Sequence, residues 1–182
     1  MMKAIVFLGD GFEECEALIT VDILRRAGVE TIMASVMERR IVESSRNIKI
    51  QADVMAEDII FDDVDLVVLP GGRGGTENLS KSSIVREKSV EFAADNNKYV
   101  AAICAAPSLL AELGLLEGKK ATCHPDFENK MKGAVLTGES VVKDGNIITG
   151  QGLGASFEFS FKLVELLVNK EKADFIKKSI CY

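Results

Sequence analysis

Hydrophobic and polar positions alternate between two patterns along the chain, short apolar runs and helical repeats. Apolar runs occur at Lys3–Leu8, Asp65–Leu69 and Tyr99–Ile103, and runs of this kind are typical of parallel strands buried on both faces. Over Glu13–Ala27 apolar residues recur every three or four positions, which predicts an amphipathic helix that ends at Gly28. Strands that alternate with helices predict an α/β fold with a doubly wound, mostly parallel sheet sandwiched by helices.

The remaining segments extend the same alternation. We expect further strands at Val29–Val36 and Lys119–Thr122, hairpins at Ile41–Gln51 and Val141–Ile148, a turn at Pro70–Gly75, and helices at Ile84–Asn96, Ala105–Leu113, Asp126–Lys132 and Phe157–Val168, with a last helical segment after Asn169. No linker, repeat or low-complexity stretch interrupts this order, so residues 1–182 are expected to form one domain.

Composition narrows the class of protein. The 182 residues are 47% hydrophobic and 27% charged, which provides a core of normal size without disulfides or a structural metal. The net charge of −6 argues against nucleic acid as a partner, because phosphate binding needs clustered Lys and Arg. No apolar stretch approaches the ~20 residues of a membrane helix, and the short run Lys3–Leu8 suits a strand better than a signal peptide. We therefore expect a cytoplasmic protein with no membrane partner.

Neither the cysteines nor the glycines form a sequence pattern that is typical of a metal site or a cofactor site. The four cysteines are far apart and form no CxxC pair, which favours free thiols: Cys15, Cys104, Cys123 and Cys181. With a single histidine, His124, a zinc site is not expected. The glycines of Pro70–Gly75 match neither a phosphate-binding loop nor a dinucleotide fingerprint, so no cofactor is predicted.

Cys104 is placed where a buried strand is expected to turn directly into a helix, with Pro107 suited to the first helical turn. A nucleophile at such a strand-to-helix junction is exposed at the top of a sheet, and the helix N-terminus would lower the pKa of its thiol. The same position also suits a cysteine that serves as a small buried hydrophobic residue, and burial would raise the pKa instead. The pattern of residues alone leaves both interpretations open.

Three strand ends carry the informative residues: the loop after Leu8, the glycine turn after Leu69, and Cys104 after Ile103. In open parallel sheets, ligands bind just beyond the carboxyl ends of the strands. These loops are therefore expected to converge on one site.

Several motifs together resemble the ThiJ/PfpI family, of the class I glutamine amidotransferase-like superfamily. They are Gly11–Glu16, Leu69–Gly72, Ala102–Pro107, His124–Pro125 and Ser156–Phe159, and they occur in the family's order over nearly the whole chain. Within the family they are most similar to the branch of the Parkinson-disease-associated protein deglycase and its bacterial relatives. The resemblance implies the flavodoxin-like sandwich that the alternating pattern also predicts.

The resemblance implies three catalytic side chains. Cys104 matches the family's nucleophile and oxidation-sensitive thiol, and Glu16 matches the carboxyl that hydrogen-bonds this sulfur and shuttles its proton. His124 matches a supporting acid/base histidine. On residue type alone, Glu16 would be a solvated carboxylate in a first helical turn, and a lone histidine would be structural.

Further roles are implied for backbone groups and for subunit contacts. The amides of Gly72 and Ala105 match an oxyanion-hole-like pocket, and Arg46 matches a basic residue near a partner subunit's pocket, although an exposed loop arginine is an equal alternative. Family members are commonly homodimers with the first helix near the interface, which Ile19 and Ile23 would suit.

The implied activity is cysteine-dependent detoxification of small 2-oxoaldehydes such as methylglyoxal, without glutathione, or deglycation of proteins and nucleotides by the same chemistry. The alternative is an oxidative-stress sensor or protective chaperone that uses oxidation of Cys104. An amide or peptide hydrolase is a further alternative. It is weaker because protease-like relatives carry a histidine directly after the nucleophile, and this chain has Ala105 there. Leu153 replaces a common proline, which is expected to alter the rim of the pocket.

Overall fold

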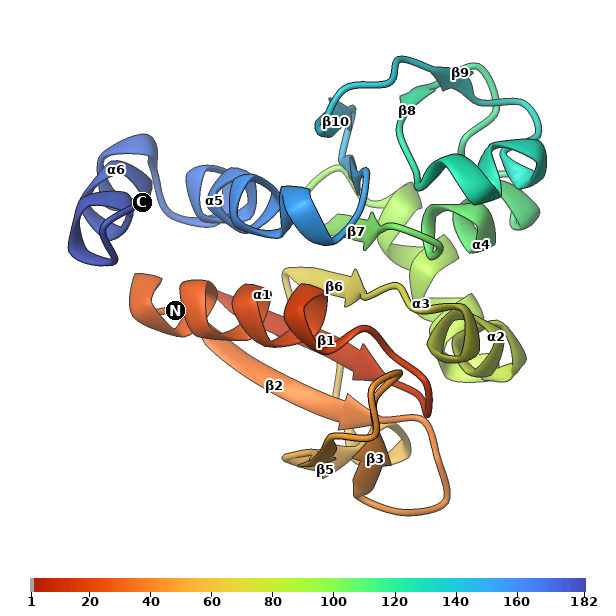
Figure 1. The fold of residues 1–182 in the computed structure, drawn as a ribbon, viewed down its shortest axis with the longest axis horizontal. Coiled ribbons are helices and arrows are strands. Elements are labelled where there is room, and N and C mark those ends of the chain that lie inside the picture. Colours follow the sequence, from red (N-terminus) through yellow and green to blue (C-terminus); the bar gives the residue numbers. More distant parts are fainter. Residues whose placement is uncertain (1) are drawn as a thin grey trace.

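A seven-stranded sheet forms the centre of the molecule in a computed structural model that describes residues 2–182 (Figure 1). Its strands run in the order β10-β11-β7-β6-β1-β2-β5. Their bounds are β1 Lys3–Leu8, β2 Glu30–Ser35, β5 Val54–Met55, β6 Leu66–Leu69, β7 Tyr99–Ile103, β10 Val141–Asp144 and β11 Ile147–Gly150. Every neighbouring pair is parallel except β10 and β11, which form the predicted antiparallel hairpin. The α/β class and the mostly parallel sheet are thus confirmed.

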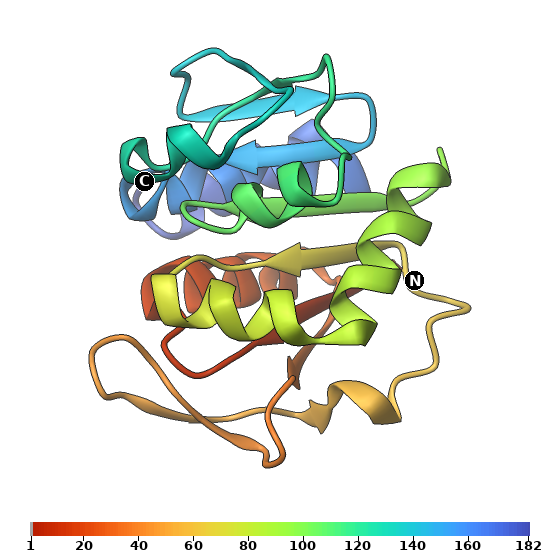
Figure 2. The same ribbon diagram turned by 90° about the vertical axis from the view of Figure 1, so that its right-hand side faces the viewer.

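Helices cover both faces of the sheet (Figures 1 and 2). One face carries α1 Glu14–Ala27, α5 Ser156–Leu167 and α6 Lys170–Ser179, and the other carries α2 Arg73–Lys81, α3 Ser83–Ala94 and α4 Pro107–Glu112. Outside the main sheet lie the two-stranded pairs β3 Ile41–Glu43 with β4 Lys49–Gln51 and β8 Lys120–Ala121 with β9 Val135–Leu136, and the 3-10 helices Ala56–Asp58, Pro125–Lys130 and Leu153–Ala155.

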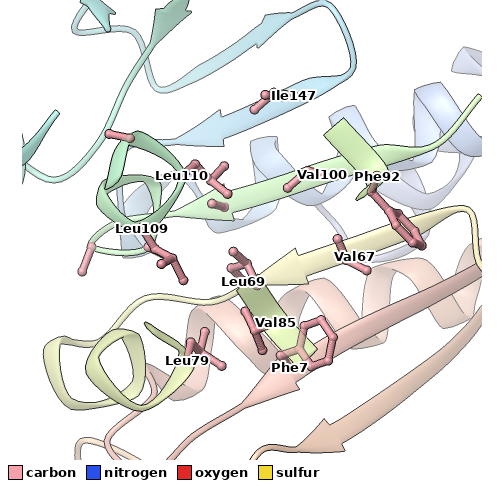
Figure 3. Packing of buried hydrophobic residues seen from close by; sticks show 14 of the residues in the cluster. Phe7, Val67, Leu69, Leu79, Val85, Phe92, Val100, Leu109, Leu110 and Ile147 are labelled. Carbon is pink, nitrogen blue, oxygen red and sulfur yellow. The ribbon is translucent and has the colours of Figure 1, made fainter. Parts of the chain in front are cut away.

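Two hydrophobic clusters hold these layers together, one on each face of the sheet. In β6, Val67 and Leu69 belong to the cluster under α2, α3 and α4, which Figure 3 shows, while Leu66 and Val68 belong to the other. Successive strand residues point to opposite faces, so an entirely apolar strand is what a sheet covered twice requires. Within residues 2–182, no helix has both the length and the apolar character that crossing a lipid bilayer requires.

Helix α1 forms where the helical repeat predicts it. The Glu13 side chain caps its first turn by accepting a hydrogen bond from the Glu16 amide, at 2.7 Å, and Gly28 ends it with a left-handed φ of 85°. Ile23 of α1 is only 1% exposed and belongs to the hydrophobic cluster that α1 forms with the sheet, α5 and α6. The prediction that Ile23 suits a subunit interface is therefore wrong, because this side chain is part of the core.

The turn after β6 is shorter than the predicted turn at Pro70–Gly75. Helix α2 already begins at Arg73, so Gly74 and Gly75 lie in its first turn. Glycine is required there by packing, because a Cβ on Gly75 would lie 2.6 Å from the Cα of Phe12. The residues that suggested a loop instead let α2 approach the loop after β1.

Candidate active site

The loops after β1, β6 and β7 lie side by side because these three strands are neighbours in the sheet. Leu69 is paired with Ala102 across β6 and β7, so the glycine turn after β6 and Cys104 after β7 project from the same edge. The Glu13 amide donates to the Gly71 carbonyl, at 2.9 Å, which ties the first loop to the second. The predicted convergence of the three loops is confirmed.

Cys104 has an unusual backbone conformation, with a left-handed φ of 65°. This region disfavours a residue with a side chain by roughly 1–2 kcal/mol, and two hydrogen bonds hold it. The Cys104 amide donates to the Gly150 carbonyl, and the Cys104 carbonyl accepts from the His124 amide, each at 2.9 Å. The chain turns here, and α4 begins only at Pro107, two residues after the predicted helix start at Ala105.

The half-buried Cys104 sulfur is surrounded by hydrogen-bonding groups from all three loops. The backbone amides of Gly72 and Ala105 act to lower the pKa of its thiol, and the Glu16 carboxyl beside it acts to raise this pKa. The two amides are those that the resemblance assigns to an oxyanion-hole-like pocket. Donors aimed at one point favour negative charge there, whether on the sulfur or on an oxygen bound next to it.

Glu16 is completely buried, in contrast to the solvated carboxylate that its residue type favours. Its Oε2 atom accepts a hydrogen bond from the Gly71 amide at 2.8 Å, while Oε1 has no hydrogen-bond partner within residues 2–182. Burial raises the pKa of this carboxyl to about 7, against the opposite effects of the neighbouring Cys104 thiol and the Gly71 amide. A carboxyl with such a pKa can both hold and release a proton near neutral pH.

The pKa of Cys104 is raised, which is one of the two outcomes that its position in the sequence allows. Burial, followed by the charge of the ionised Glu16 carboxylate and the hydrogen bond to it, raises the pKa of the thiol to about 12. The structure thus favours the second of the two interpretations that the sequence leaves open, in which burial raises the thiol pKa, and the facing carboxylate adds to this effect. The two groups lose their protons in two steps, and between these steps the pair holds a single proton.

Gly71 allows the carboxyl and the thiol to meet. A Cβ atom at this position would lie 2.5 Å from Glu16 Oε2 and 2.6 Å from the Cys104 Cβ. A Cβ atom essentially never lies this close to a non-bonded atom, so the approach of Glu16 to Cys104 requires glycine at position 71.

Replacing Gly72 with alanine is expected to destabilise the chain through close contacts with the loop after β1. The new Cβ would lie 2.3 Å from the Gly11 carbonyl oxygen, and we expect the free energy of unfolding to fall by about 2 kcal/mol beyond a matched control. That control is Gly114→Ala, because Gly72 and Gly114 have similar left-handed φ values of 83° and 75°, and nothing lies within 4 Å of a Cβ at Gly114. Denaturant unfolding measures both variants, and equal losses would contradict the packing argument.

His124 lies at the mouth of the site with its side chain 44% exposed. Its Nδ1 accepts a hydrogen bond from the Asp126 amide, at 3.2 Å, which caps the 3-10 helix Pro125–Lys130. A neutral ring that accepts at Nδ1 carries its hydrogen on Nε2. His124 and Cys104 approach the same glycine, since a Cβ on Gly152 would lie 3.6 Å from His124 Cδ2 and 4.0 Å from the Cys104 sulfur.

A cavity of about 560 Å³ opens over the sulfur. It is lined by Glu13, Glu16, Cys104, His124, Pro125, Ser140, Gln151, Gly152, Leu153, Gly154 and Ala155. Leu153 lies on its rim, as predicted, and is 52% exposed. Sequence reasoning missed Glu13, although its position three residues before Glu16 is that of a side chain capping the helix.

Arg46 does not line this cavity. Its exposed side chain donates to the Ser45 carbonyl in the loop between β3 and β4, and its charge acts to lower the pKa of Glu13. Arg46 thus lies near the cavity without entering it, and its contact with a partner subunit stays a prediction. All four cysteines are free, and no group of three or more His, Cys, Asp or Glu side chains in residues 2–182 is placed to hold a metal ion.

The buried Glu16 carboxyl is expected to make stability depend on pH. Because its pKa is raised from 4.5 to about 7, its contribution is full below pH 4.5 and is lost as the pH rises through about 7. Between about pH 4 and about pH 8, the free energy of unfolding should fall by about 3 kcal/mol relative to the Glu16→Gln variant, which cannot titrate. Urea unfolding over this range measures the difference, and a difference independent of pH would contradict the raised pKa.

Comparisons with known proteins agree over almost the full length of the chain. The sequence pattern of the DJ-1/PfpI family matches residues 2–166. Protein dj-1beta of Drosophila melanogaster is 37% identical over 182 residues, covering 98% of this chain and 96% of that protein. Glutathione-independent glyoxalase DJ-1 of Schizosaccharomyces pombe is 29% identical, covering 99% and 98%. The structure of oxidized Toxoplasma gondii DJ-1 is similar with a TM-score of 0.95 at 34% identity, covering 100% and 99%.

Proposed function

The chain belongs to the DJ-1/PfpI family, and from this membership we propose that it is a glutathione-independent glyoxalase that converts small 2-oxoaldehydes to 2-hydroxy acids. The observation that carries the proposal is the buried Glu16 carboxyl beside the Cys104 sulfur, under an open cavity. A relative from Schizosaccharomyces pombe that bears the name of this activity, at 29% identity, supports it.

The first step is addition of the sulfur to the aldehyde carbon. With one proton shared by the pair, transfer of that proton from sulfur to Glu16 leaves a thiolate, which forms a carbon–sulfur bond with methylglyoxal. The electron pair of the carbonyl moves to its oxygen, where the amides of Gly72 and Ala105 stabilise the charge until the Glu16 carboxyl gives the oxygen the proton that it took from sulfur and becomes a carboxylate again. The product of this step is a hemithioacetal.

The second step moves a proton from one carbon to its neighbour. The Glu16 carboxylate removes the hydrogen from the carbon bound to sulfur, and the adjacent carbon is reprotonated, which gives a 2-hydroxy thioester. Water then attacks the thioester, releases lactate and returns the sulfur. The sum is methylglyoxal plus water to lactate, so no oxidant, reductant or glutathione is consumed.

The proposal is tested by incubating the purified chain with methylglyoxal in the absence of glutathione and measuring D-lactate. We expect catalytic turnover that stops when Cys104 is alkylated beforehand. Loss of methylglyoxal without formation of lactate would mean that the protein only traps the aldehyde. The deglycase activity that the resemblance also implies uses the same thiolate, and the same assay with glycated peptides would extend the test to it.

His124 is proposed to move protons at the cavity mouth, and the variant His124→Asn isolates this role. Asparagine is a good helix cap and can accept the Asp126 amide through its side-chain oxygen, but it lacks the Nε2 atom. We expect kcat for lactate formation to fall about 10²-fold with unchanged thermal stability. An unchanged kcat would show that His124 is only the cap of the 3-10 helix.

A sensor of oxidation is the second candidate, and the surroundings of the sulfur favour it. The amide donors of Gly72 and Ala105 and a protonated Glu16 can bind the oxygens of a sulfinic acid formed at Cys104. Mass spectrometry after mild peroxide treatment would decide it. Oxidation of the exposed Cys181 before Cys104 would count against a sensor.

A homodimer is also proposed from family membership. Ile23 cannot contribute because it is buried in the core, whereas Ile19 on the same helix is partly exposed. Sedimentation analysis should give twice the mass of the chain, and a monomer at all concentrations would contradict the proposal.

A further inference from the structure

A second cavity, of about 530 Å³, lies between α2, α4 and the 3-10 helix Pro125–Lys130. Figure 2 shows α2 and α4 next to each other on the face turned to the viewer. Buried apolar side chains form its floor, namely Leu109, Ala111 and Phe127. Its lining shares no described residue with the cavity over Cys104. The volume is in the range of pockets that bind small molecules.

Positive charge gathers at the rim of this cavity, although the chain as a whole carries a net charge of −6. Arg73, Lys130 and Lys132 all line it. The Arg73 guanidinium carbon lies 5.2 Å from the centre of the Phe127 ring, and the Lys130 Nζ lies 5.3 Å from it. Cation–π contacts of this length position both cations beside the apolar floor.

Two carboxylates also lie at the rim, and they do not cancel this charge. Glu112 accepts a hydrogen bond from the Arg86 guanidinium at 2.7 Å, so its charge is already offset. Glu77 is the remaining acidic residue of the lining, against three cations. The balance favours an anionic group on the side of Arg73 and Lys130.

One polar group of the wall is left without a hydrogen-bond partner. Thr76 is 7% exposed, and its buried hydroxyl makes no hydrogen bond within residues 2–182. By contrast, the Ser108 hydroxyl in the same lining donates to the Ala105 carbonyl at 2.7 Å. The Thr76 oxygen has almost no solvent-accessible surface, so the polar contacts of a bound molecule fall to Arg73 and Lys130.

We propose that this cavity binds a small aromatic anion, a flat apolar ring that carries a phosphate or carboxylate group. The ring rests on Leu109 and Ala111, and the anionic group contacts Arg73 and Lys130. The planar guanidinium of arginine and the compact ammonium group of lysine both bind oxygen anions. This site is separate from the proposed aldehyde chemistry. Arg73 lines the second cavity, but it directly follows Gly72 of the Cys104 site. An experiment that tests the proposal must therefore distinguish binding in the two cavities.

Isothermal titration calorimetry of the full chain with phenyl phosphate tests the proposal. We expect one saturable site, equally in the unmodified protein and in protein carboxymethylated at Cys104. In the double variant Arg73→Gln/Lys130→Gln the affinity should fall at least about tenfold. The matched control Lys143→Gln/Lys178→Gln removes two exposed lysines elsewhere, so it should bind as the wild type does.

Inorganic phosphate and phenol, which correspond to the anionic and the aromatic part of the probe, should each bind at least about tenfold more weakly than phenyl phosphate. Four results would overturn the proposal: no saturable binding below about 10 mM, equal binding of inorganic phosphate, equal binding by the Arg73/Lys130 double variant, or loss of binding after carboxymethylation. The last result would place the probe in the Cys104 cavity. None of these results depends on turnover of an aldehyde.

Discussion

Replacing Cys104 with serine is expected to lower kcat/KM for lactate formation from methylglyoxal by about 10³-fold or more. Serine keeps the size of the side chain, but a hydroxyl is far harder to ionise than a thiol, so the hemithioacetal cannot form. The contacts that hold this residue are made by its backbone, so the variant should fold. D-lactate formed by equal amounts of the two proteins measures the effect.

The matched control is Cys181→Ser, since Cys181 is another free cysteine with a left-handed φ, of 61°, near the end of the chain. It should retain the full rate. Comparable rates in the Cys104 and Cys181 variants would rule out the sulfur at the strand end as the nucleophile.

The second large effect is expected from Glu16→Gln, which should reduce kcat by about 10²- to 10⁴-fold. Glutamine has the same shape and can still accept the Gly71 amide, but it cannot take the proton of the thiol or remove one from carbon. Single-turnover experiments followed by mass spectrometry would show whether addition of the aldehyde or the later proton transfer is slowed.

Glu14→Gln is the control for this variant. Glu14 is a second buried carboxyl of the same helical turn, but it accepts from the Ser45 hydroxyl at 3.2 Å and does not line the cavity. We expect near wild-type activity, and an equal loss in both variants would assign the effect to the stability of α1.

The fold was largely predictable because the spacing of apolar residues changes clearly between strands, where it is continuous, and helices, where it repeats every three or four positions. The entirely apolar run ending at Leu69 could only suit a strand covered on both faces, and Gly28 marks the end of α1. Helix α2 was missed for a physical reason. Gly74 and Gly75 are poor helix formers, so the sequence alone favours a loop. Glycine is required at position 75 because Phe12, which is distant in the sequence, packs against it in the fold.

The site was predictable as a set of neighbours but not in its electrostatics. The order of motifs brought Cys104, Gly72 and Glu16 to one edge of the sheet, where the structure also has them. The depth of burial of Glu16, which sets both pKa values, depends on packing between three loops and has no local signal in the sequence. A helix N-terminus suggested a lowered thiol pKa, whereas burial and a facing carboxylate raise it.

The proposed mechanism depends on the single proton that Glu16 and Cys104 hold between them near neutral pH. When Glu16 takes this proton, the sulfur is a reactive thiolate. The pH dependence of Cys104 alkylation by iodoacetamide measures this directly. We predict a rate that rises with a midpoint near pH 7, where the pair loses its first proton, and again near pH 12. In Glu16→Ala the first midpoint should move up by at least about one pH unit, because the proton acceptor is gone. A wild-type thiol that stays unreactive until pH 9 or above, or identical profiles for the two proteins, would contradict the account.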